Sequence, residues 1–216
     1  MNPTHAIGRI IYDVLPGAMK ERLRDAVGGS PRPQWSRVVM NRSTEQFVRS
    51  LDPRSLDALE ISGNRWKGLP FRSYRSIDFP EYDLCAGPLA SQNWDIILLD
   101  QVLEHVVSPA KAVRNIWTML RPGGVFVNTT PFLIPIHEHP IDCSRWTETG
   151  IKHFLADNGF PLDGIQTGSW GNRHCLIANL SGRWPAYIPL LHSVKNDPRY
   201  PVVVWAFAQK TGAANP

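Results

Sequence analysis

Short apolar runs alternate with helix-like stretches between residues 56 and 210. LDALEIS, DIILL, GVFVNTT and VVVWAFA are rich in β-branched residues, and helical patterns separate them. Alternation of this kind is typical of βαβ units, in which helices cover both faces of a mainly parallel sheet. We therefore predict an α/β fold, and the 216 residues are enough for one domain with a full hydrophobic core.

Two of the intervening stretches carry clear helix signals. SPAKAVRNIWTMLRPGG has Ser108 at the expected N-cap, Pro109 at the first helical position and the pair Gly123-Gly124 as its expected stop. TETGIKHFLADNGF is expected to begin after Thr147 and to end at Gly159. These two helices supply part of the cover that the sheet needs.

The N-terminal part of the chain has a different texture. HAIGRIIYDVLP and GAMKERLRDAV read as short amphipathic helices, and the breaker run GGSPRP ends them. STEQFVRSLD reads as a further helix, with Ser43 as N-cap and Gln46 completing a capping box. We expect residues 1–55 to form a helical lid or appendage, residues 56–210 the globular domain, and residues 211–216 a tail.

Composition excludes several classes of protein. Hydrophobic residues make up 43% and charged residues 19%, as in ordinary globular proteins, and the net charge of +4 is spread without a basic run. No nucleic-acid partner is therefore expected. The cysteines at 85, 143 and 175 form no motif, and no apolar stretch is long enough to span a membrane. A reduced, cytoplasmic location is expected, and the oligomeric state is left open.

Polar residues follow the predicted strands where a parallel sheet binds its ligands, beyond the carboxyl ends. ALEISGN places Glu60 and Gly63 after one strand, and SIDFPEYD places Asp78 after the next. The pattern G-x-G-x-x-G is absent, which disfavours a nicotinamide oxidoreductase and favours a ligand that is positively charged and lacks phosphate. Taken singly, each segment also fits an ordinary turn or a solvated acidic loop.

WDIILLDQVLEHVVSPAKAVRNIWTMLRPGGVFVNTTPF resembles the fourth strand, the following helix and the fifth strand of class I S-adenosylmethionine-dependent methyltransferases, most closely the small type 11 group. The residues that match its signature D-x-I-x-x-x-x-V-L-E-H are Asp95, Ile96, Val102, Leu103, Glu104 and His105. L-R-P-G-G is matched at residues 120–124, and the likeness covers about residues 56–160. The resemblance implies a Rossmann-like, seven-stranded, mainly parallel sheet with an N-terminal helical lid.

S-adenosyl-L-methionine is the cofactor that the resemblance implies, with S-adenosyl-L-homocysteine as product. The first family motif, L-D-x-G-x-G-x-G, is altered here to Leu59-Glu60-Ile61-Ser62-Gly63-Asn64. Carried over by position, the methionine part falls to Glu60, Ile61, Ser62 and Gly63, the ribose to Asp78, the adenine to Asp83 and Leu84, and the sulfonium to Asp100 and Gln101. His105 is expected to make a structural hydrogen bond.

PFLIPIHEHPIDCSRWT, residues 131–147, follows the fifth family strand and so faces the methyl end of the cofactor. It resembles the pattern H-x-x-P-x-D-x-x-R-x-T of small methyltransferases associated with polysaccharide biosynthesis. A sugar hydroxyl is a poor nucleophile until a base takes its proton, and histidine titrates near neutrality. We predict His137 as this base with His139 as second choice, and Asp142 to orient an imidazole or grip a substrate hydroxyl.

A saccharide acceptor also needs a pocket. Arg145 and Trp146 are expected to shape it, and Tyr12, Trp35 and Trp170 to stack on sugar rings, although most tryptophans in proteins belong to the core. The sequence thus predicts a sugar O-methyltransferase.

Three alternatives stay open. His137, His139 and Asp142 are the residue types that hold a divalent ion such as magnesium, but the spacing lacks a patterned fourth ligand, so no metal is assigned. The acceptor is alternatively a lipid-like or phenolic molecule. The third alternative is a non-catalytic binding subunit that keeps the methyltransferase fold and has lost the cofactor.

Overall fold

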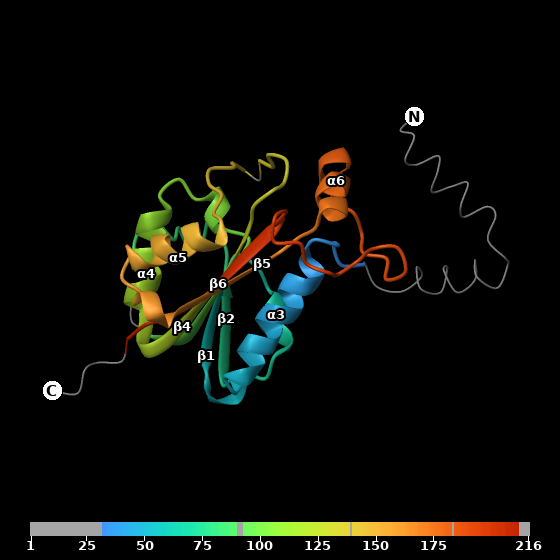
Figure 1. The fold of residues 1–216 in the computed structure, drawn as a ribbon. Helices are drawn as coiled ribbons and strands as arrows, with labels where there is room; N and C mark the ends of the chain where they lie inside the picture. Colours follow the sequence, from blue (N-terminus) through green and yellow to red (C-terminus); the bar gives the residue numbers. More distant parts are fainter. Residues whose placement is uncertain (1–31, 90–92, 139, 183, 212–216) are drawn as a thin grey trace, which may run out of the picture. The chain divides into compact units, whose positions relative to one another are not determined.

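The computed structural model describes residues 32–89, 93–138, 140–182 and 184–211 (Figure 1). Six strands form one sheet in the order β2-β1-β3-β4-β6-β5. Their bounds are β1 Asp57–Ile61, β2 Ser73–Ile77, β3 Trp94–Asp100, β4 Leu120–Pro131, β5 Ile165–Trp170 and β6 Val203–Gln209. The four apolar runs in the sequence correspond to β1, β3, β4 and β6, so the prediction of an α/β sheet is confirmed.

The first four strands run parallel, and the last two reverse. β1 pairs in parallel with β2 and β3, and β3 pairs in parallel with β4, whereas β6 lies antiparallel between β4 and β5. The carboxyl ends of β1, β2, β3 and β4 therefore meet at one edge of the sheet, which we call the carboxyl edge. Because β1 and β3 are neighbours and β2 lies outside them, the strand order reverses there, as at ligand sites of open α/β sheets.

The expectation of seven strands is wrong for the part of the chain that the structure describes, which contains six. Residues 78–93 connect β2 to β3. One parallel crossover alone needs about a dozen residues or more. This segment also carries Pro80, Gly87 and Pro88. It is too short and too broken to contain two crossovers and a strand between them.

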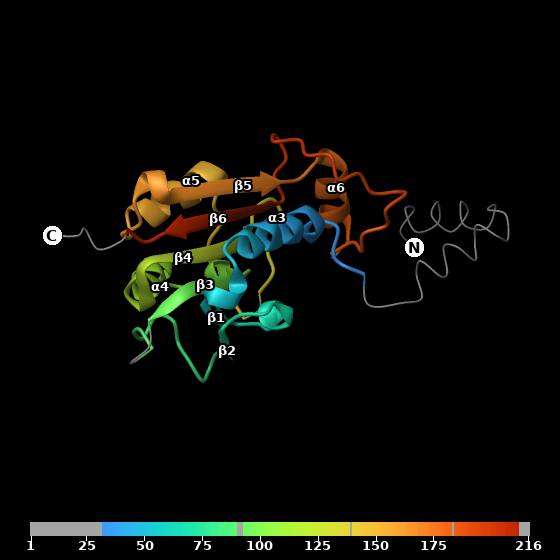
Figure 2. The same ribbon diagram turned by 90° about the horizontal axis from the view of Figure 1, so that it is seen from below.

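Helices cover both faces of the sheet (Figures 1 and 2). Side chains of β3 alternate between the faces: Ile96 and Leu98 pack in a cluster with Val48, and Ile97 and Leu99 in a cluster with Ile116. Burial on both faces explains why β3 reads as a continuous apolar run. The helices are α3 Arg37–Ser50 on one face, α4 Pro109–Met119 and α5 Glu148–Ala156 on the other, and α6 Arg173–Ser181 after β5.

Single-turn 3₁₀ helices complete the described secondary structure, and two of them lie at the carboxyl edge. η2 follows β1 and η3 follows β3. Their bounds are η1 Pro53–Ser55, η2 Arg65–Gly68, η3 Leu103–His105 and η4 Leu162–Gly164.

Helix ends test the capping signals. The Thr147 side chain accepts a hydrogen bond from Gly150 N, and α5 begins directly after it, as predicted. α4 begins at Pro109 as predicted but ends at Met119, because β4 already starts at Leu120. The predicted capping box at Ser43 is wrong, since α3 runs through that position from residue 37.

The N-terminal prediction falls mostly outside the described residues. Both amphipathic helices expected before residue 31, with Tyr12, belong to this part. The chain divides into two units, residues 1–33 and residues 34–216. α3, which the sequence assigned to the appendage, lies in the larger unit and stacks Phe47 on Phe207 of β6, with ring centroids 3.8 Å apart. None of the helices in the described ranges has the length and apolar character needed to cross a bilayer.

Candidate active site

Glu60 organises the turn after β1. Its side chain is buried, with only 1% of the residue exposed. One carboxylate oxygen accepts a hydrogen bond from Arg65 N at 2.9 Å. The other accepts hydrogen bonds from Trp66 N at 3.0 Å and from the Tyr74 hydroxyl. Burial and the neighbouring carboxylate raise the pKa of Tyr74, which keeps this hydroxyl a donor. The turn is therefore held by a fully engaged carboxylate.

Ser62 and Gly63 form the turn itself. Both have positive φ, 60° and 150°, and a Cβ on Gly63 would lie 2.9 Å from a carboxylate oxygen of Glu60. This close approach explains why the residue at position 63 has no side chain. Ser62 N donates to Ile77 O at 3.0 Å, which places the turn beside the end of β2 and the exposed Asp78 that follows it. Ile61, the last residue of β1, is buried.

Asp100 and Gln101 end β3 at the same edge. The Asp100 carboxylate pairs with the Arg65 guanidinium at 2.7 Å. It also accepts a hydrogen bond from the Thr129 hydroxyl at 3.1 Å. Gln101 has a positive φ of 57°, and its side-chain amide donates to the same hydroxyl at 3.2 Å. Strand ends β1, β3 and β4 are thus joined by one polar network.

Asp83 and Leu84 lie in the segment after β2. The Asp83 carboxylate accepts a hydrogen bond from Cys85 N at 2.8 Å and is otherwise exposed. Leu84 is buried in the core, and its carbonyl accepts a hydrogen bond from Asn115 of α4. The segment is therefore anchored from below, while its acidic side chain faces outward.

The loop after β4 carries the predicted base. His137 N donates to Asp142 at 2.8 Å, and Asp142 forms a two-point ion pair with Arg145. These contacts fix the backbone around His137. His139 lies outside the described residues, so its placement is not part of this geometry.

η3 brings two more side chains to His137. Cys143 N donates to the Glu104 carbonyl at 2.6 Å, which ties the loop to η3. The rings of His105 and His137 meet edge to face with centroids 4.9 Å apart. His105 Nε2 lies 3.8 Å from a Glu104 carboxylate oxygen. Its Nδ1 lies 2.5 Å from the Ile141 carbonyl, in agreement with the structural hydrogen bond predicted for His105.

Electrostatics at this cluster are unusual. Glu104 has no exposed surface, and neither carboxylate oxygen has a hydrogen-bond partner among the described residues. Burial raises the pKa of Glu104 to about 8. Burial, followed by the nearby His105, lowers the pKa of His137 below its ordinary value. His137 is therefore uncharged near neutral pH and has a nitrogen lone pair.

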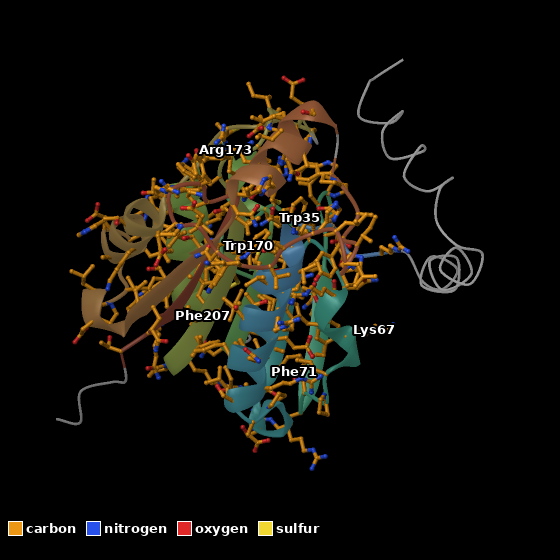
Figure 3. The ribbon with its side chains drawn as sticks, turned by 45° about the vertical axis from the view of Figure 1, so that its right-hand side comes forward. Trp35, Lys67, Phe71, Trp170, Arg173 and Phe207 are labelled. Carbon is orange, nitrogen blue, oxygen red and sulfur yellow. The ribbon has the colours of Figure 1, made fainter. Side chains whose placement is uncertain are left out.

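The aromatic residues predicted to contact a sugar do not all lie at this site. Trp35 and Trp170 lie in one core cluster with 3% and 1% exposure (Figure 3). Their indole N–H groups donate to the carbonyls of Ser193 and Val194. Neither ring offers the open face that stacking on a sugar requires. Trp146 is half-buried against Phe154 and lies near the loop.

Three contributors to the site had weak sequence signals. Arg65 pairs with Asp100 across 35 positions, and no local pattern indicates it. Trp184 lies edge-on to His137 with centroids 5.3 Å apart, but its distance along the chain conceals this. Glu104 was matched only as part of a family signature, and its burial without partners is visible only in the structure.

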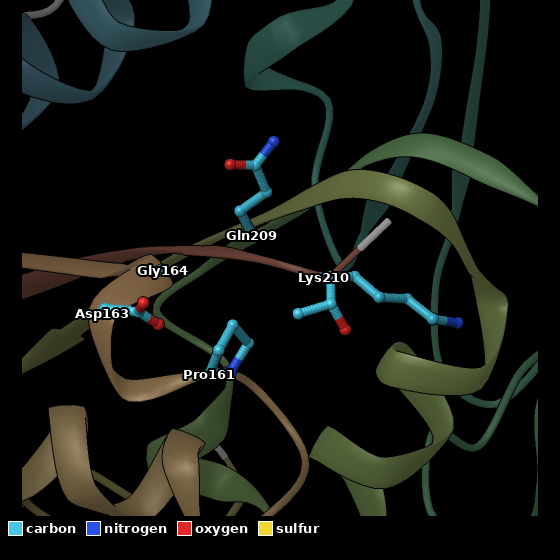
Figure 4. A pocket seen from close by; sticks show the side chains of 6 residues that line it. Pro161, Asp163, Gly164, Gln209 and Lys210 are labelled. Carbon is cyan, nitrogen blue, oxygen red and sulfur yellow. The ribbon is translucent and has the colours of Figure 1, made fainter. Parts of the chain in front are cut away.

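The cavity in Figure 4 does not belong to this site. It measures about 320 Å³ and is lined by residues around η4 and the end of β6, including Asp163 and Gln209. Gln209 pairs with Val125 near the start of the central strands, so the cavity lies at the opposite edge of the sheet. The carboxyl edge carries the candidate chemistry.

Sequence comparisons address the same region. Residues 45–128 match the family model described as methyltransferase domain. Over 101 residues the chain is 30% identical to a probable S-adenosylmethionine-dependent methyltransferase of Mycolicibacterium smegmatis. The match covers 42% of this chain and only 37% of that relative, so the chain spans little more than a third of the relative's length.

Solved structures show the fold. A S-adenosylmethionine-dependent methyltransferase of Thermotoga maritima, described as a possible histamine N-methyltransferase, aligns with a TM-score of 0.52 and 13% identity over 78% of this chain and 88% of its own. Phosphoethanolamine N-methyltransferase 2 of Haemonchus contortus, solved with S-adenosyl-L-methionine, aligns with a TM-score of 0.51 and 11% identity over 79% and 52%. The fold is thus the Rossmann-like methyltransferase fold, here with a mixed six-stranded sheet. Together with the family match, this supports the class of S-adenosylmethionine-dependent methyltransferases.

Proposed function

We propose that the protein transfers the methyl group of S-adenosyl-L-methionine to a hydroxyl of a saccharide, with His137 as general base. The observation that carries the proposal is the position of His137 on a fixed loop at the carboxyl edge. His137 has a lowered pKa, stands on a loop fixed by the Asp142–Arg145 pair, and follows the strand beside β3. Such a group accepts a proton at neutral pH without first having to lose one.

The cofactor fits the side chains at the ends of β1, β2 and β3. Asp78 is an exposed carboxylate directly after β2, where it can accept hydrogen bonds from the ribose hydroxyls. Asp100 adds a partly exposed carboxylate at the end of β3. Glu60 is engaged by three donors of the protein and so acts by holding the turn that surrounds the methionine part. The altered first motif keeps this turn with one glycine instead of three.

The reaction forms an oxygen–carbon and a nitrogen–hydrogen bond and breaks a carbon–sulfur and an oxygen–hydrogen bond. When bound, the cofactor supplies a methyl carbon attached to a positively charged sulfur. His137 takes the proton of the acceptor hydroxyl while the acceptor oxygen bonds to that carbon and the carbon–sulfur bond breaks. The loop aligns the acceptor for in-line displacement, and positioning of this kind supplies much of the acceleration.

A saccharide is favoured by the groups around His137. Trp184 offers a half-buried aromatic ring beside the imidazole, and Arg145 adds donor groups next to Asp142. Aromatic faces combined with hydrogen-bonding groups suit the mixed apolar and polar surface of a sugar ring. Trp146 stands close in sequence and is the remaining candidate for the acceptor pocket.

Three measurements test this function. Calorimetric titration with S-adenosyl-L-homocysteine should show binding, which would not occur in a methyltransferase-fold subunit that has lost its cofactor. A screen of saccharide, phenolic and lipid-like acceptors should give methyl transfer only with saccharides. Because the base must be neutral, turnover should fall on acidification below the depressed pKa of His137 and not at its ordinary value. Activity on phenols alone would contradict the proposed acceptor.

A further inference from the structure

Glu104, His105 and His137 bring three metal-binding groups together. The carboxylate oxygen and the two imidazole nitrogens all lie within 4.8 Å of one another. Donors around an ion with bonds of about 2.0–2.2 Å lie up to about 4 Å apart, so side-chain shifts of about 1 Å close the set. This donor set is distinct from the His137, His139 and Asp142 combination that the sequence suggested.

The second observation is the state of Glu104. Its carboxylate has no exposed surface and no hydrogen-bond partner in the described part of the chain, and it faces the His105 ring at 3.8 Å. A buried polar group without a partner is costly, and a buried carboxylate more so. Bound cations are a common solution to this cost.

His105 is held as a metal ligand is held. A carbonyl oxygen only accepts hydrogen bonds, so the contact between His105 Nδ1 and the Ile141 carbonyl places the proton on Nδ1. Nε2 then carries the lone pair, and it is the nitrogen that faces Glu104. Metal-binding histidines characteristically donate their other N–H to a carbonyl or carboxylate in this way.

Access and charge allow an ion to enter. Glu104 forms the closed floor, while His105 has a side-chain exposure of 16% and His137 is only half-buried. The charged groups that influence Glu104 are Arg37 from α3 and Arg145 and Asp142 from the loop. Because Arg145 is already paired with Asp142, Arg37 is the main charge among these that opposes a cation.

We propose that Glu104, His105 and His137 form a binding site for one divalent transition-metal ion of the zinc or cobalt type. Two imidazoles and one carboxylate leave further coordination positions for water or an acceptor oxygen. Hard ions such as magnesium prefer oxygen ligands, so this set discriminates against them.

Cobalt(II) alone is the probe for this site. Titration of the chelator-treated full-length protein should produce visible ligand-field bands that saturate at one ion per chain. Glu104→Gln keeps the side-chain shape and should weaken binding by at least about 100-fold, more than the loss of an outer-shell partner costs. Glu138→Gln, an exposed residue of the same loop, is the matched control and should bind as the wild type does.

Three results would overturn the site: no saturable bands, equal affinity in the wild type and Glu104→Gln, or equal weakening in Glu138→Gln. Circular dichroism of Glu104→Gln separates lost binding from lost folding, and His105→Gln provides a second, independent ligand removal that should also weaken binding at least about 100-fold. Magnesium should neither produce nor compete away the cobalt signal.

An occupied site also has a consequence that rests on the proposed function. The ion and the acceptor proton compete for the lone pair of His137, so zinc should inhibit methyl transfer and a chelator should restore it. Stimulation by zinc would refute His137 as base and leave the metal site intact. If cobalt did not bind while turnover was normal, the metal site would be refuted and the role of His137 as base would stand.

Discussion

Glu60 and Glu104 are both buried glutamates at the carboxyl edge, with 1% and 0% exposure, yet their surroundings are opposite. Glu60 accepts hydrogen bonds from two backbone amides and a tyrosine hydroxyl. Glu104 has no hydrogen-bond partner among the described residues. A buried carboxylate with hydrogen-bond partners stabilises the structure. A buried carboxylate without them is costly unless a ligand, an ion or a proton compensates its charge.

The comparison assigns different work to two neighbouring regions. The Glu60 region is a turn held by three hydrogen bonds, and under the proposed function it shapes the cofactor side. The Glu104 region includes His105 and His137, and under the two proposals it is the side where the acceptor proton or a metal ion binds. Variants should therefore separate binding of the cofactor from chemistry, and separate stabilising from destabilising substitutions.

The largest effect should follow from His137→Ala. Losing the general base should lower kcat for an alcohol acceptor by about 10²–10⁴-fold. The affinity for S-adenosyl-L-homocysteine should stay within about twofold, because the ring stands on the Glu104 side and not on the Glu60 turn. Steady-state kinetics and calorimetry measure the two quantities. Glu138→Ala in the same loop is the control. If His137→Ala lost cofactor affinity together with kcat, the Glu60 and Glu104 regions would not have separate roles.

Glu60→Ala should have the next largest effect. Three donors lose their acceptor, two of them buried or partly buried amides, and we expect the free energy of unfolding to fall by about 3 kcal/mol. Cofactor affinity should fall with it, since the turn loses its anchor. Urea denaturation measures the first effect and calorimetry the second.

The control for this variant is Glu81→Ala. Glu81 is exposed in the segment that follows β2, and its loss should change the free energy of unfolding by about 0.5 kcal/mol or less. Equal destabilisation in both variants would mean that the partners of Glu60 add nothing beyond a general charge effect.

Local patterns predicted the parts of the fold that local physics decides. Residues 96–99 of β3 are all apolar because both faces of the strand are buried there, and Thr147 caps α5 through a contact only three residues away. The capping box at Ser43 failed because α3 is stabilised by packing on the sheet, where Phe47 stacks on Phe207. Tertiary contacts of that kind override a capping signal.

The candidate site likewise has parts that the sequence predicted and parts that it did not. The sequence predicted that Glu60, Asp78 and Asp100 lie at one edge of the sheet, because each stands at or just after the end of a predicted strand and the carboxyl ends of parallel strands meet at one edge. The partner of Asp100 and the isolation of Glu104 depend on distant segments that meet only in the folded chain. The residues next to a buried carboxylate in the sequence do not indicate whether it has hydrogen-bond partners in the folded chain. The difference between Glu60 and Glu104 was therefore not predictable from the sequence.

Glu104→Gln should stabilise the protein, in contrast to substitutions at Glu60. The pKa of Glu104 rises from its ordinary value of 4.5 to about 8 in the folded protein. Between these values the folded protein holds a proton that the unfolded chain has lost, so the wild type loses stability as pH rises through this window. Above pH 8, Glu104→Gln should therefore be more stable, by at least about 1 kcal/mol.

Thermal unfolding with a chelator present measures this difference. The gap between Glu104→Gln and the wild type should close near the ordinary pKa of a carboxyl group, where the glutamate is neutral in both states. Glu138→Gln should show no such pH dependence. If Glu104→Gln destabilised the protein equally at every pH, the carboxylate would have partners of the kind that Glu60 has, and the contrast would fail.

Gly63→Ala tests the rigidity of the Glu60 turn. The new Cβ would lie 2.9 Å from a Glu60 carboxylate oxygen, and the φ of 150° is strained for any side chain. We expect a loss of about 1–2 kcal/mol. Gly68→Ala is the matched control, because a Cβ there meets nothing within 4 Å.

Chemical denaturation of the two alanine variants decides how the turn responds. If Gly63→Ala is as mild as Gly68→Ala, the Glu60 carboxylate moves aside at little cost, and the turn is not fixed by its three donors. If only Gly63→Ala is destabilised, the carboxylate cannot move without losing hydrogen bonds to Arg65, Trp66 and Tyr74. That second result would explain why a single glycine is enough in this motif: the glutamate fixes the turn from below, and only the residue that approaches it must lack a side chain.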